Sequence, residues 1–584
     1  MRTKRMTAVG LLAAVSLLMT GTAGADSGTG AAPPPAVTVS GEPAAAVGGT
    51  GPAPDADADG EIIAAQQADL TGDIVFSESS RTFRGQISVS LSTTVSDAEI
   101  RYTTDGRLPT ASSPVYTGPL EFRTTTQLRA RAFVGGAPSG DPGTALYTAR
   151  SFDATHDLPV MVMDAYGGGK PGREYRDVST MVMEPQGGTA SLSATPTVAT
   201  RAGFRLRGQS SAEFEKAPYR LELWDNDNDD AAYPMLGMPA EADWVLRGPF
   251  SDKALIRDAF VYSLGRDMGM ETPRFAFFEL YLNLDSQPVS PDDYQGVYML
   301  VETIKDGPDR IDIEKLRKSD TTLPEISGGY IFKFEWFAAE EPILHCPGGG
   351  WDCWRDLEIK RPKSPNSQQM QWLGQHLKEF HDALRGPDPS HPQTGYPAYI
   401  DVGSFVDQII IAELSRDMDA YIRSSYFHKD RNEKIVAGPL WDYDLTFGTG
   451  GFFNNTEIRG WQFQEVRQPV ANDWFVRLMD DPSFVQRVDT RWRQLRQGIL
   501  SDQQINARIN SLASPLTNGA QRNFQKWPNL TQPMIGFFFT PTAPTWQGQV
   551  DFMRDWTHRR AAWLDSSGWR PNAGFAVAPD RQLP

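Results

Sequence analysis

GPLWDYDLTFGTGG, from Gly438 to Gly451, is the most informative stretch of this chain. Two acids, Asp442 and Asp444, stand two residues apart among Trp, Tyr, Leu and Phe, and a glycine-rich turn follows them. An Asp buried among such apolar side chains is costly unless something pairs with it. A divalent metal is one such partner, and the capping of a turn is the simpler alternative.

The segment before this stretch supplies two more acids, Asp417 and Asp419, in a short loop after a predicted helix that ends near Met418. SSYFHKD and EKIVAGPLW then predict two strands of a hairpin, so this loop and the acids after the second strand meet at one edge. Converging carboxylates repel one another unless a cation lies between them. Oxygen-only ligation suits Mg²⁺ or Mn²⁺, with Ca²⁺ as the alternative.

The order of these groups is also that of phosphoryl-transfer enzymes. A protein kinase places a catalytic-loop Asp, then a hairpin, then a metal-binding Asp closely followed by Gly. Upstream, in RLRGQSSAEFEKAPYRLEL, the residues Gly208, Ser210 and Ser211 predict a tight turn whose backbone N–H groups face phosphates. Lys216 lies on the strand predicted to follow, as a phosphate-pairing lysine would, and an ordinary strand-edge lysine is the alternative.

The N-terminal region predicts export. Residues 1–25 combine a positive start, a short apolar run and an Ala-Gly-Ala cleavage signal, as secretory signal peptides do, and a retained anchor is the alternative. Residues 26–72, rich in Ala, Pro, Gly and Asp, predict a flexible linker. No later segment is long and apolar enough to span a membrane. We therefore expect a secreted, extracellular protein that is associated with the cell surface or free in solution.

Charge and cysteine content exclude some classes of function. The net charge of −17 argues against a nucleic-acid ligand, because phosphate backbones bind basic surfaces. The chain has two cysteines, Cys346 and Cys353, which are too few for a zinc site at the usual spacing. In an oxidising compartment, closure of the loop HCPGGGWDC by a disulfide is the favoured interpretation, with free thiols as the alternative.

Residues 73–152 predict a small all-β sandwich, because short runs of alternating polarity are separated by turn-forming residues. The stretch IRYTTDGRLPTASSPVYTGPLEF, with YTTDG-x-x-PT at Tyr102–Thr110 as its strongest element, resembles the chitobiase C-terminal-like module. The resemblance implies an immunoglobulin-like domain. A structural spacer is the first interpretation of its role, and sugar binding is the second.

In residues 153–570 strands come first, with one helix among them, and helices follow, which predicts a segregated α+β fold. Residues 571–584 form a tail. The motifs RGQSS-x-x-x-x-KAPYRLEL, DWVLRGPFSDKALIRDAF, YQGVYMLVETIK, GGYIFKFE and GPLWDYDLTFG resemble the CotH family of spore-coat-type proteins. The resemblance implies a two-lobed, atypical protein-kinase-like domain.

The CotH resemblance also implies an activity: transfer of the γ-phosphate of ATP, with Mg²⁺ or Mn²⁺, to Ser or Thr of an exported protein. By motif position, Asp419 is the catalytic acid that orients the acceptor hydroxyl. Asp442 is the metal ligand, and Asp444 supports it. The residues implied in nucleotide or phosphate binding are Lys216, Arg207, Ser210, Ser211 and Glu302.

Two departures from the kinase pattern keep a second hypothesis open. Ser424 stands where kinases place an Asn that holds a second metal, and Ser is a weaker ligand. The helix predicted at 253–268 offers no Glu to pair with Lys216. The alternative is a catalytically inactive surface or scaffold protein, with cell-wall polysaccharide as its partner through the small β module. Glycosidase chemistry fits less well, because two acids in one loop do not flank a sugar.

Overall fold

The structure is a computed structural model that describes residues 70–335, 341–347, 353–355, 357–466 and 472–570, which belong to one compact unit of the chain. The predicted signal peptide at 1–25, nearly all of the linker at 26–72 and the tail at 571–584 lie outside the described residues. No helix in the described part is long and apolar enough to cross a membrane.

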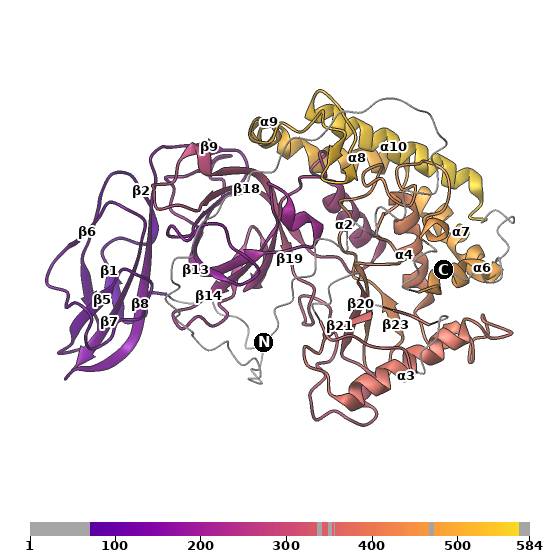
Figure 1. Cartoon of the computed structure of the whole chain (residues 1–584), viewed down its shortest axis with the longest axis horizontal. Coiled ribbons are helices and arrows are strands. Elements are labelled where there is room, and N and C mark those ends of the chain that lie inside the picture. The colour runs from indigo at the N-terminus through magenta and orange to yellow at the C-terminus, as the bar shows by residue number, and fades with distance from the viewer. Residues whose placement is uncertain (1–69, 336–340, 348–352, 356, 467–471, 571–584) are drawn as a thin grey trace, which may run out of the picture. The chain divides into compact units, whose positions relative to one another are not determined.

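The first folded part is built of β-strands, as the alternating sequence predicts (Figure 1). A four-stranded sheet has the order β2-β8-β7-β5, and the pairs β1-β4 and β3-β6 accompany it. Inward-facing residues such as Val89, Leu128 and Tyr147 are fully buried and form its core. The strands are β1 (Ile74–Phe76), β2 (Arg81–Phe83), β3 (Ile87–Val89), β4 (Leu91–Thr93), β5 (Glu99–Thr103), β6 (Leu120–Phe122), β7 (Thr126–Val134) and β8 (Ala137–Ala149).

A closed barrel follows, with β10 and β18 as its one parallel pair and antiparallel neighbours elsewhere. Apolar side chains such as Met161, Phe204 and Trp244 fill its interior, as the alternation of inward and outward residues requires. In spatial order the strands are β10 (Val160–Asp164), β11 (Arg176–Met183), β13 (Val198–Leu206), β14 (Tyr219–Trp224), β17 (Asp243–Arg247), β19 (Tyr294–Glu302) and β18 (Phe275–Asn283). Two small pairs accompany it, β9 (Thr155–His156) with β12 (Ala190–Ser191) and β15 (Tyr233–Met235) with β16 (Met238–Glu241).

The remaining part combines one sheet with helices. The sheet has the order β21-β20-β22-β23, with β20 (Tyr330–Phe334), β21 (Leu357–Arg361), β22 (Ser425–Lys429) and β23 (Ile435–Ala437). The hairpin predicted before Asp442 is present, because β22 and β23 pair antiparallel with Phe427 opposite Ala437. The helices are α2 (Arg257–Met268), α3 (Ser367–Ala383), α4 (Val402–Ser415), α5 (Gln462–Glu465), α6 (Trp474–Asp480), α7 (Pro482–Arg496), α8 (Asp502–Ala513), α9 (Thr517–Lys526) and α10 (Trp546–Ser567), and β24 (Met534–Ile535) pairs with β25 (Phe538–Phe539).

The predicted α+β class is thus confirmed, whereas the two-lobed, kinase-like arrangement remains a prediction. Helix α4 begins where the Asp401 side chain accepts a hydrogen bond from the Ser404 N–H. It ends three residues before the predicted Met418, because Arg416 adopts a left-handed conformation with φ of 45°. The chain is then free to form the loop that carries Asp419.

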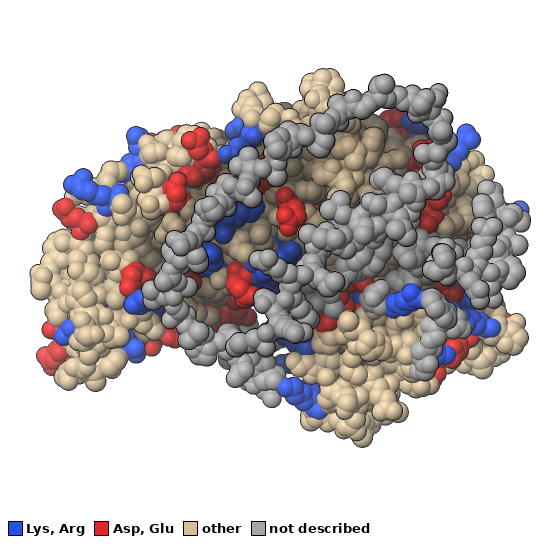
Figure 2. Space-filling model, viewed as in Figure 1, with Lys and Arg blue, Asp and Glu red and all other residues tan. Residues whose placement is uncertain are grey.

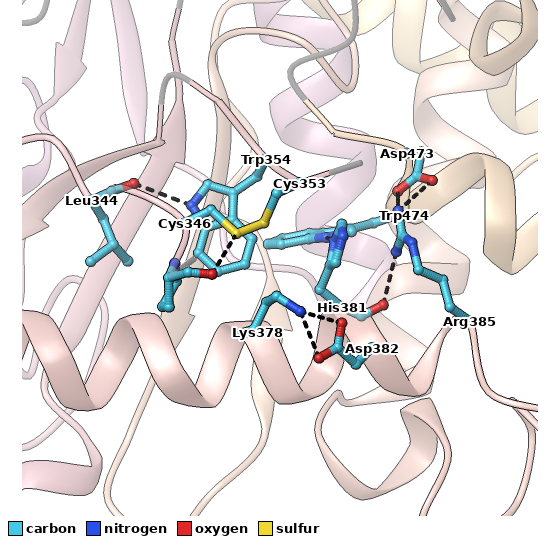
Figure 3. Close-up of a disulfide and its surroundings, with 11 residues drawn as sticks. Leu344, Cys346, Cys353, Trp354, Lys378, His381, Asp382, Arg385, Asp473 and Trp474 are labelled. Atoms are coloured by element: carbon cyan, nitrogen blue, oxygen red, sulfur yellow. Dashed lines mark hydrogen bonds and ion pairs between the residues drawn. A yellow bond between two sulfur atoms is a disulfide. The ribbon is translucent and has the colours of Figure 1, made fainter. Parts of the chain in front are cut away.

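A disulfide joins Cys346 and Cys353 beside α3 (Figure 3). Next to it, the Trp354 indole donates a hydrogen bond to the Leu344 carbonyl at 3.2 Å. Its ring also lies edge-on to Trp474, at 6.3 Å between centroids. The disulfide therefore fixes a short segment against the aromatic core of the helical part.

Helix α9 is attached to the barrel through the buried carboxylate of Glu279. Arg522 of α9 donates a hydrogen bond to Glu279 at 2.6 Å, and the imidazole of His156 lies at 2.7 Å from the same oxygen. Burial alone would raise the pKa of Glu279, but His156, Arg522 and Tyr294 bring this pKa down to about 2. The ionised carboxylate is therefore strongly preferred in the folded protein.

Glu279→Gln is expected to lower the free energy of unfolding by about 3 kcal/mol at neutral pH, since the folded pKa lies below the ordinary value near 4.5. The contribution is present above pH 4.5 and is lost as pH falls towards 2, where the native carboxylate is protonated. Urea unfolding of both proteins between pH 3 and 7 measures this difference. A difference that stays constant over this range would contradict the account, and Glu121→Gln on β6 is an exposed control.

Candidate active site

One cleft gathers most of the predicted site residues. From the part that follows the barrel it is lined by Asp419, Ser424, Asp442 and Asp444. From the loop after β13 it is lined by Arg207, Ser210 and Ser211. Segments more than 200 residues apart in the chain thus meet at one place, as the sequence analysis predicts.

Backbone contacts fix the position of Asp442. Its φ is +73°, a left-handed conformation that Asp tolerates better than bulkier residues do. Its N–H donates to the hydroxyl of Tyr262 in α2 at 3.1 Å, and the next N–H, of Tyr443, donates to Asp258 at 2.8 Å. Helix α2 therefore holds the turn that presents the carboxylate to the cleft.

The carboxylate of Asp442 is held by Arg247 and Ser424. Arg247 Nη1 donates to Asp442 Oδ1 at 2.8 Å, and Nη2 contacts the same oxygen. The Ser424 hydroxyl donates to Asp442 Oδ2 at 3.0 Å. Burial alone would raise the pKa of Asp442, but Arg247 and Arg207 hold this pKa below its usual value. Asp442 is therefore an anion at neutral pH.

Burial raises the pKa of both Asp444 and Asp419, but to different extents. Burial raises the pKa of Asp444 to about 8, with Arg247 opposing the shift and Asp442 adding to it, while the Ser251 hydroxyl donates to Asp444 at 3.1 Å. Burial raises the pKa of Asp419 to about 6, and Arg423, at 3.1 Å, opposes the shift. At neutral pH Asp419 is thus mostly a carboxylate, able to accept a proton. Asp444 is mostly protonated at this pH, and a cation bound beside it would favour its ionised form.

The donor set fits a magnesium-type ion that also binds phosphate. Among the described residues no three His, Cys, Asp or Glu side chains converge closely enough to hold a metal by themselves. Mg²⁺, however, is typically held by one or two carboxylates together with substrate phosphates and water. Asp442 and Asp444, with the hydroxyl of Ser424 beside them, supply such a set.

The loop after β13 forms another part of the cleft lining. Gly208 has φ of +83°, and a Cβ at this position would lie 2.1 Å from the Ser211 hydroxyl, so only glycine fits. Ser210 and Ser211 begin a short 3₁₀ turn, Ser210–Glu213. The Arg207 guanidinium stacks on the ring of Trp441 at 4.9 Å. The predicted tight turn is therefore present, with its cation and hydroxyls at the cleft.

Comparison with known families finds two matching regions in the chain. A family model described as CotH kinase protein matches residues 204–564. The chain belongs to the CotH kinase protein family. A model of the chitobiase/beta-hexosaminidase C-terminal domain matches residues 78–144, so both predicted resemblances are confirmed. No curated protein matches the chain.

Two of the predicted nucleotide-binding residues of the CotH domain lie elsewhere. Lys216 is fully buried, and its ammonium donates to the Val297 carbonyl at 2.6 Å and to the Asn523 side chain at 2.7 Å. Burial lowers the pKa of Lys216 well below its usual value. Lys216 thus joins α9 to the barrel and does not line the cleft, because its hydrogen-bonding partners are inside the protein. This corrects the phosphate contact predicted for Lys216.

Glu302, the second of these residues, is also placed outside the cleft. It forms ion pairs with Arg274 and Arg310, both at 2.7 Å, at a separate cavity of about 350 Å³. A carboxylate with two guanidinium partners is already neutralised, so a structural role accounts for it. The predicted position of Glu302 near the nucleotide is corrected in the same way.

One ion pair beside the cleft, between Arg247 and Asp258, was not predicted from the sequence. Arg247, the last residue of β17, lies with its Nε 3.2 Å from Asp258 in the first turn of α2. Helix α2 has no Glu to pair with Lys216, as the sequence indicated, but it supplies Asp258, which pairs with Arg247. The available signal was the presence of these two charges in otherwise apolar segments, WVLRG and IRDAFVY.

The overall negative charge of the CotH protein is not concentrated near one site on the visible surface. On the face that Figure 2 shows, acidic and basic side chains are interspersed outside the grey trace.

Proposed function

We propose that this CotH-family chain is an atypical kinase that transfers the γ-phosphate of ATP to Ser or Thr of an exported protein. The observation that carries the proposal is the convergence of Asp419, Ser424, Asp442 and Asp444 on one cleft with the Gly208 turn. This set combines a base, a metal-binding pair and a phosphate-facing turn, which are the parts that phosphoryl transfer requires.

Each residue has a distinct task in this proposal. Asp419 accepts the proton of the acceptor hydroxyl as its oxygen attacks the γ-phosphorus, and ADP leaves with the bridging oxygen. Asp442 and Asp444, with Ser424, would hold Mg²⁺ or Mn²⁺, which when bound neutralises charge on the phosphates. Arg207, Ser210 and Ser211 would contact phosphate oxygens from the loop after β13.

The setting of the reaction rests on the N-terminal sequence. Residues 1–25 have the pattern of a signal peptide, so the protein and its substrate are proposed to act outside the cytoplasm, in solution or at the cell surface. The chitobiase-like module is proposed to be a spacer or a contact to cell-wall polysaccharide.

Incubation of the purified protein with radiolabelled ATP and casein, as a generic Ser/Thr acceptor, tests the activity. Label that enters protein with Mg²⁺ and is absent when EDTA replaces Mg²⁺ would support a metal-dependent kinase. Absence of transfer to casein and to the protein itself, in a folded sample that binds no ATP, would overturn the proposal.

Three observations also favour the second candidate function, an inactive scaffold with the CotH fold. Arg247 already neutralises Asp442, Lys216 is turned into the protein, and the cleft encloses about 140 Å³, below the 300–1,000 Å³ of common ligand pockets. In the kinase hypothesis the cleft has to open for ATP. In the scaffold hypothesis it stays closed, and partner binding survives Asp442→Ala.

A further inference from the structure

Arg247 occupies the position that a cation would take beside Asp442. Both of its terminal nitrogens contact Asp442 Oδ1, and Ser424 donates to the other oxygen. A metal that approaches Asp442 in this arrangement meets a carboxylate whose charge is already neutralised and whose Oδ1 is already engaged. Removal of the guanidinium from Asp442 is therefore a precondition for strong metal ligation there.

The rest of the Arg247 side chain is anchored independently of Asp442. Its Nε pairs with Asp258 at 3.2 Å, and Asp258 also accepts a hydrogen bond from the Tyr443 N–H at 2.8 Å. The guanidinium lies 5.6 Å from the ring centroid of Trp441. The terminal nitrogens can thus exchange one anionic partner for another while Nε stays at the cleft wall.

Phosphate is the anion best suited to compete for those nitrogens. The planar guanidinium forms paired hydrogen bonds with phosphate as readily as with carboxylate. Lys216, to which the sequence assigned a phosphate contact, is enclosed by Val297 and Asn523 and cannot perform this exchange without leaving them.

We propose that Arg247 is a positioning residue that competes with the divalent cation for Asp442 and is drawn away by the phosphates of the nucleotide. This inference rests on the proposed function and adds its regulation: metal ions alone bind weakly, and nucleotide frees the metal ligand. Because binding free energies are linked, the metal strengthens nucleotide binding by the same factor.

Arg247→Gln separates this role from a merely structural one, because the two ligands respond in opposite directions. Without the guanidinium, Asp442 is free, so Mn²⁺ alone is expected to bind about fivefold tighter or more. The phosphate partner is also lost, so the ATP analogue AMP-PNP in EDTA is expected to bind about fivefold more weakly or worse. Electron paramagnetic resonance of free Mn²⁺ and calorimetry of AMP-PNP measure the two affinities.

Three further variants define the result. Adding Asp442→Asn to Arg247→Gln is expected to abolish the gain in Mn²⁺ affinity, which locates the gain at Asp442. Arg247→Lys keeps the positive charge but makes fewer contacts, so its affinities for Mn²⁺ and AMP-PNP are expected to fall between those of the wild type and Arg247→Gln. This variant replaces Arg247→Gln in the test if the Gln variant does not fold. Arg220→Gln breaks an ion pair with Asp243 away from the cleft and leaves both affinities unchanged.

The outcomes separate this inference from the proposed function. Suppose that the wild type binds AMP-PNP, but that Mn²⁺ binds Arg247→Gln no more tightly than the wild type. The proposed competition is then overturned, whereas the kinase proposal stands. If Arg247→Gln does not fold, the same criterion applies to Arg247→Lys. If no folded protein of the series binds AMP-PNP, both the role of phosphate and the kinase proposal are overturned, whatever Mn²⁺ does.

Discussion

Asp419→Asn is expected to slow phosphate transfer about 10²–10⁴-fold while leaving the affinity for Mg²⁺-ATP within about twofold. Asn has nearly the same shape as Asp but cannot accept a proton from the acceptor hydroxyl. Asp419 is suited to that task because it lines the cleft and its pKa of about 6 leaves it ionised at neutral pH. It is also separate from the Arg247 contact that engages Asp442.

Single-turnover transfer from radiolabelled ATP to casein, together with calorimetric titration of ATP, gives the rate and the affinity for Asp419→Asn. Asp382→Asn, which alters an exposed ion pair with Lys378 on α3, is the matched control and should change neither. Transfer by Asp419→Asn within about fivefold of the wild type would exclude Asp419 as the base. A parallel loss of rate and affinity would indicate that the cleft itself had collapsed.

Glu413→Ala is expected to cost about 3–5 kcal/mol of stability, the largest structural effect of any single change proposed for this protein. Glu413 of α4 and Arg560 of α10 are both fully buried and pair at 3.1 Å. The carboxylate also accepts hydrogen bonds from the N–H groups of Gln462 and Phe463 and from the Tyr421 hydroxyl. Truncation therefore leaves three donors without their acceptor and removes the counter-charge of a buried guanidinium, which keeps only its bonds to backbone carbonyls.

Differential scanning calorimetry should show the helical part of Glu413→Ala unfolding about 10 °C below the wild type, given the usual shift per kcal/mol for a domain of this size. Hydrogen exchange should speed up in α4 and α10 first. Glu379→Gln, on the exposed side of α3, is the control and should shift the transition by less than about 2 °C. A Glu413→Ala transition within that same margin would mean that the backbone carbonyls around Arg560 suffice to hold its buried charge.

Local sequence patterns predicted a large part of this molecule. Alternating polarity indicated the β-strands, and the spacing of apolar residues indicated the helix now defined as α2. The hairpin β22–β23 follows from two apolar runs separated by KDRNEK, and it explains why Asp419 and Asp442 meet. These features depend on residues near one another in the chain, which is where periodicity and turn chemistry carry information.

The features that could not be predicted depend on residues far apart in the chain. The parallel pairing of β10 with β18 closes the barrel, and no short-range pattern specifies it. Arg247 and Asp442 are separated by 195 positions, and only the folded chain shows that they pair. The sequence around Lys216 predicts a lysine at the edge of a strand, yet the side chain is buried against Asn523 of α9. In each case tertiary packing, rather than local propensity, decides the position of the charge.

Calorimetric titration of ATP into the wild type and Asp442→Ala, each with Mg²⁺ and with EDTA, tests the central claim most directly. The account predicts that Mg²⁺ strengthens ATP binding by the folded wild type and that Asp442→Ala removes this enhancement. Absence of ATP binding by the folded wild type, or equal enhancement by Mg²⁺ in both proteins, would contradict the assignment of Asp442 to a metal–nucleotide site and favour the scaffold.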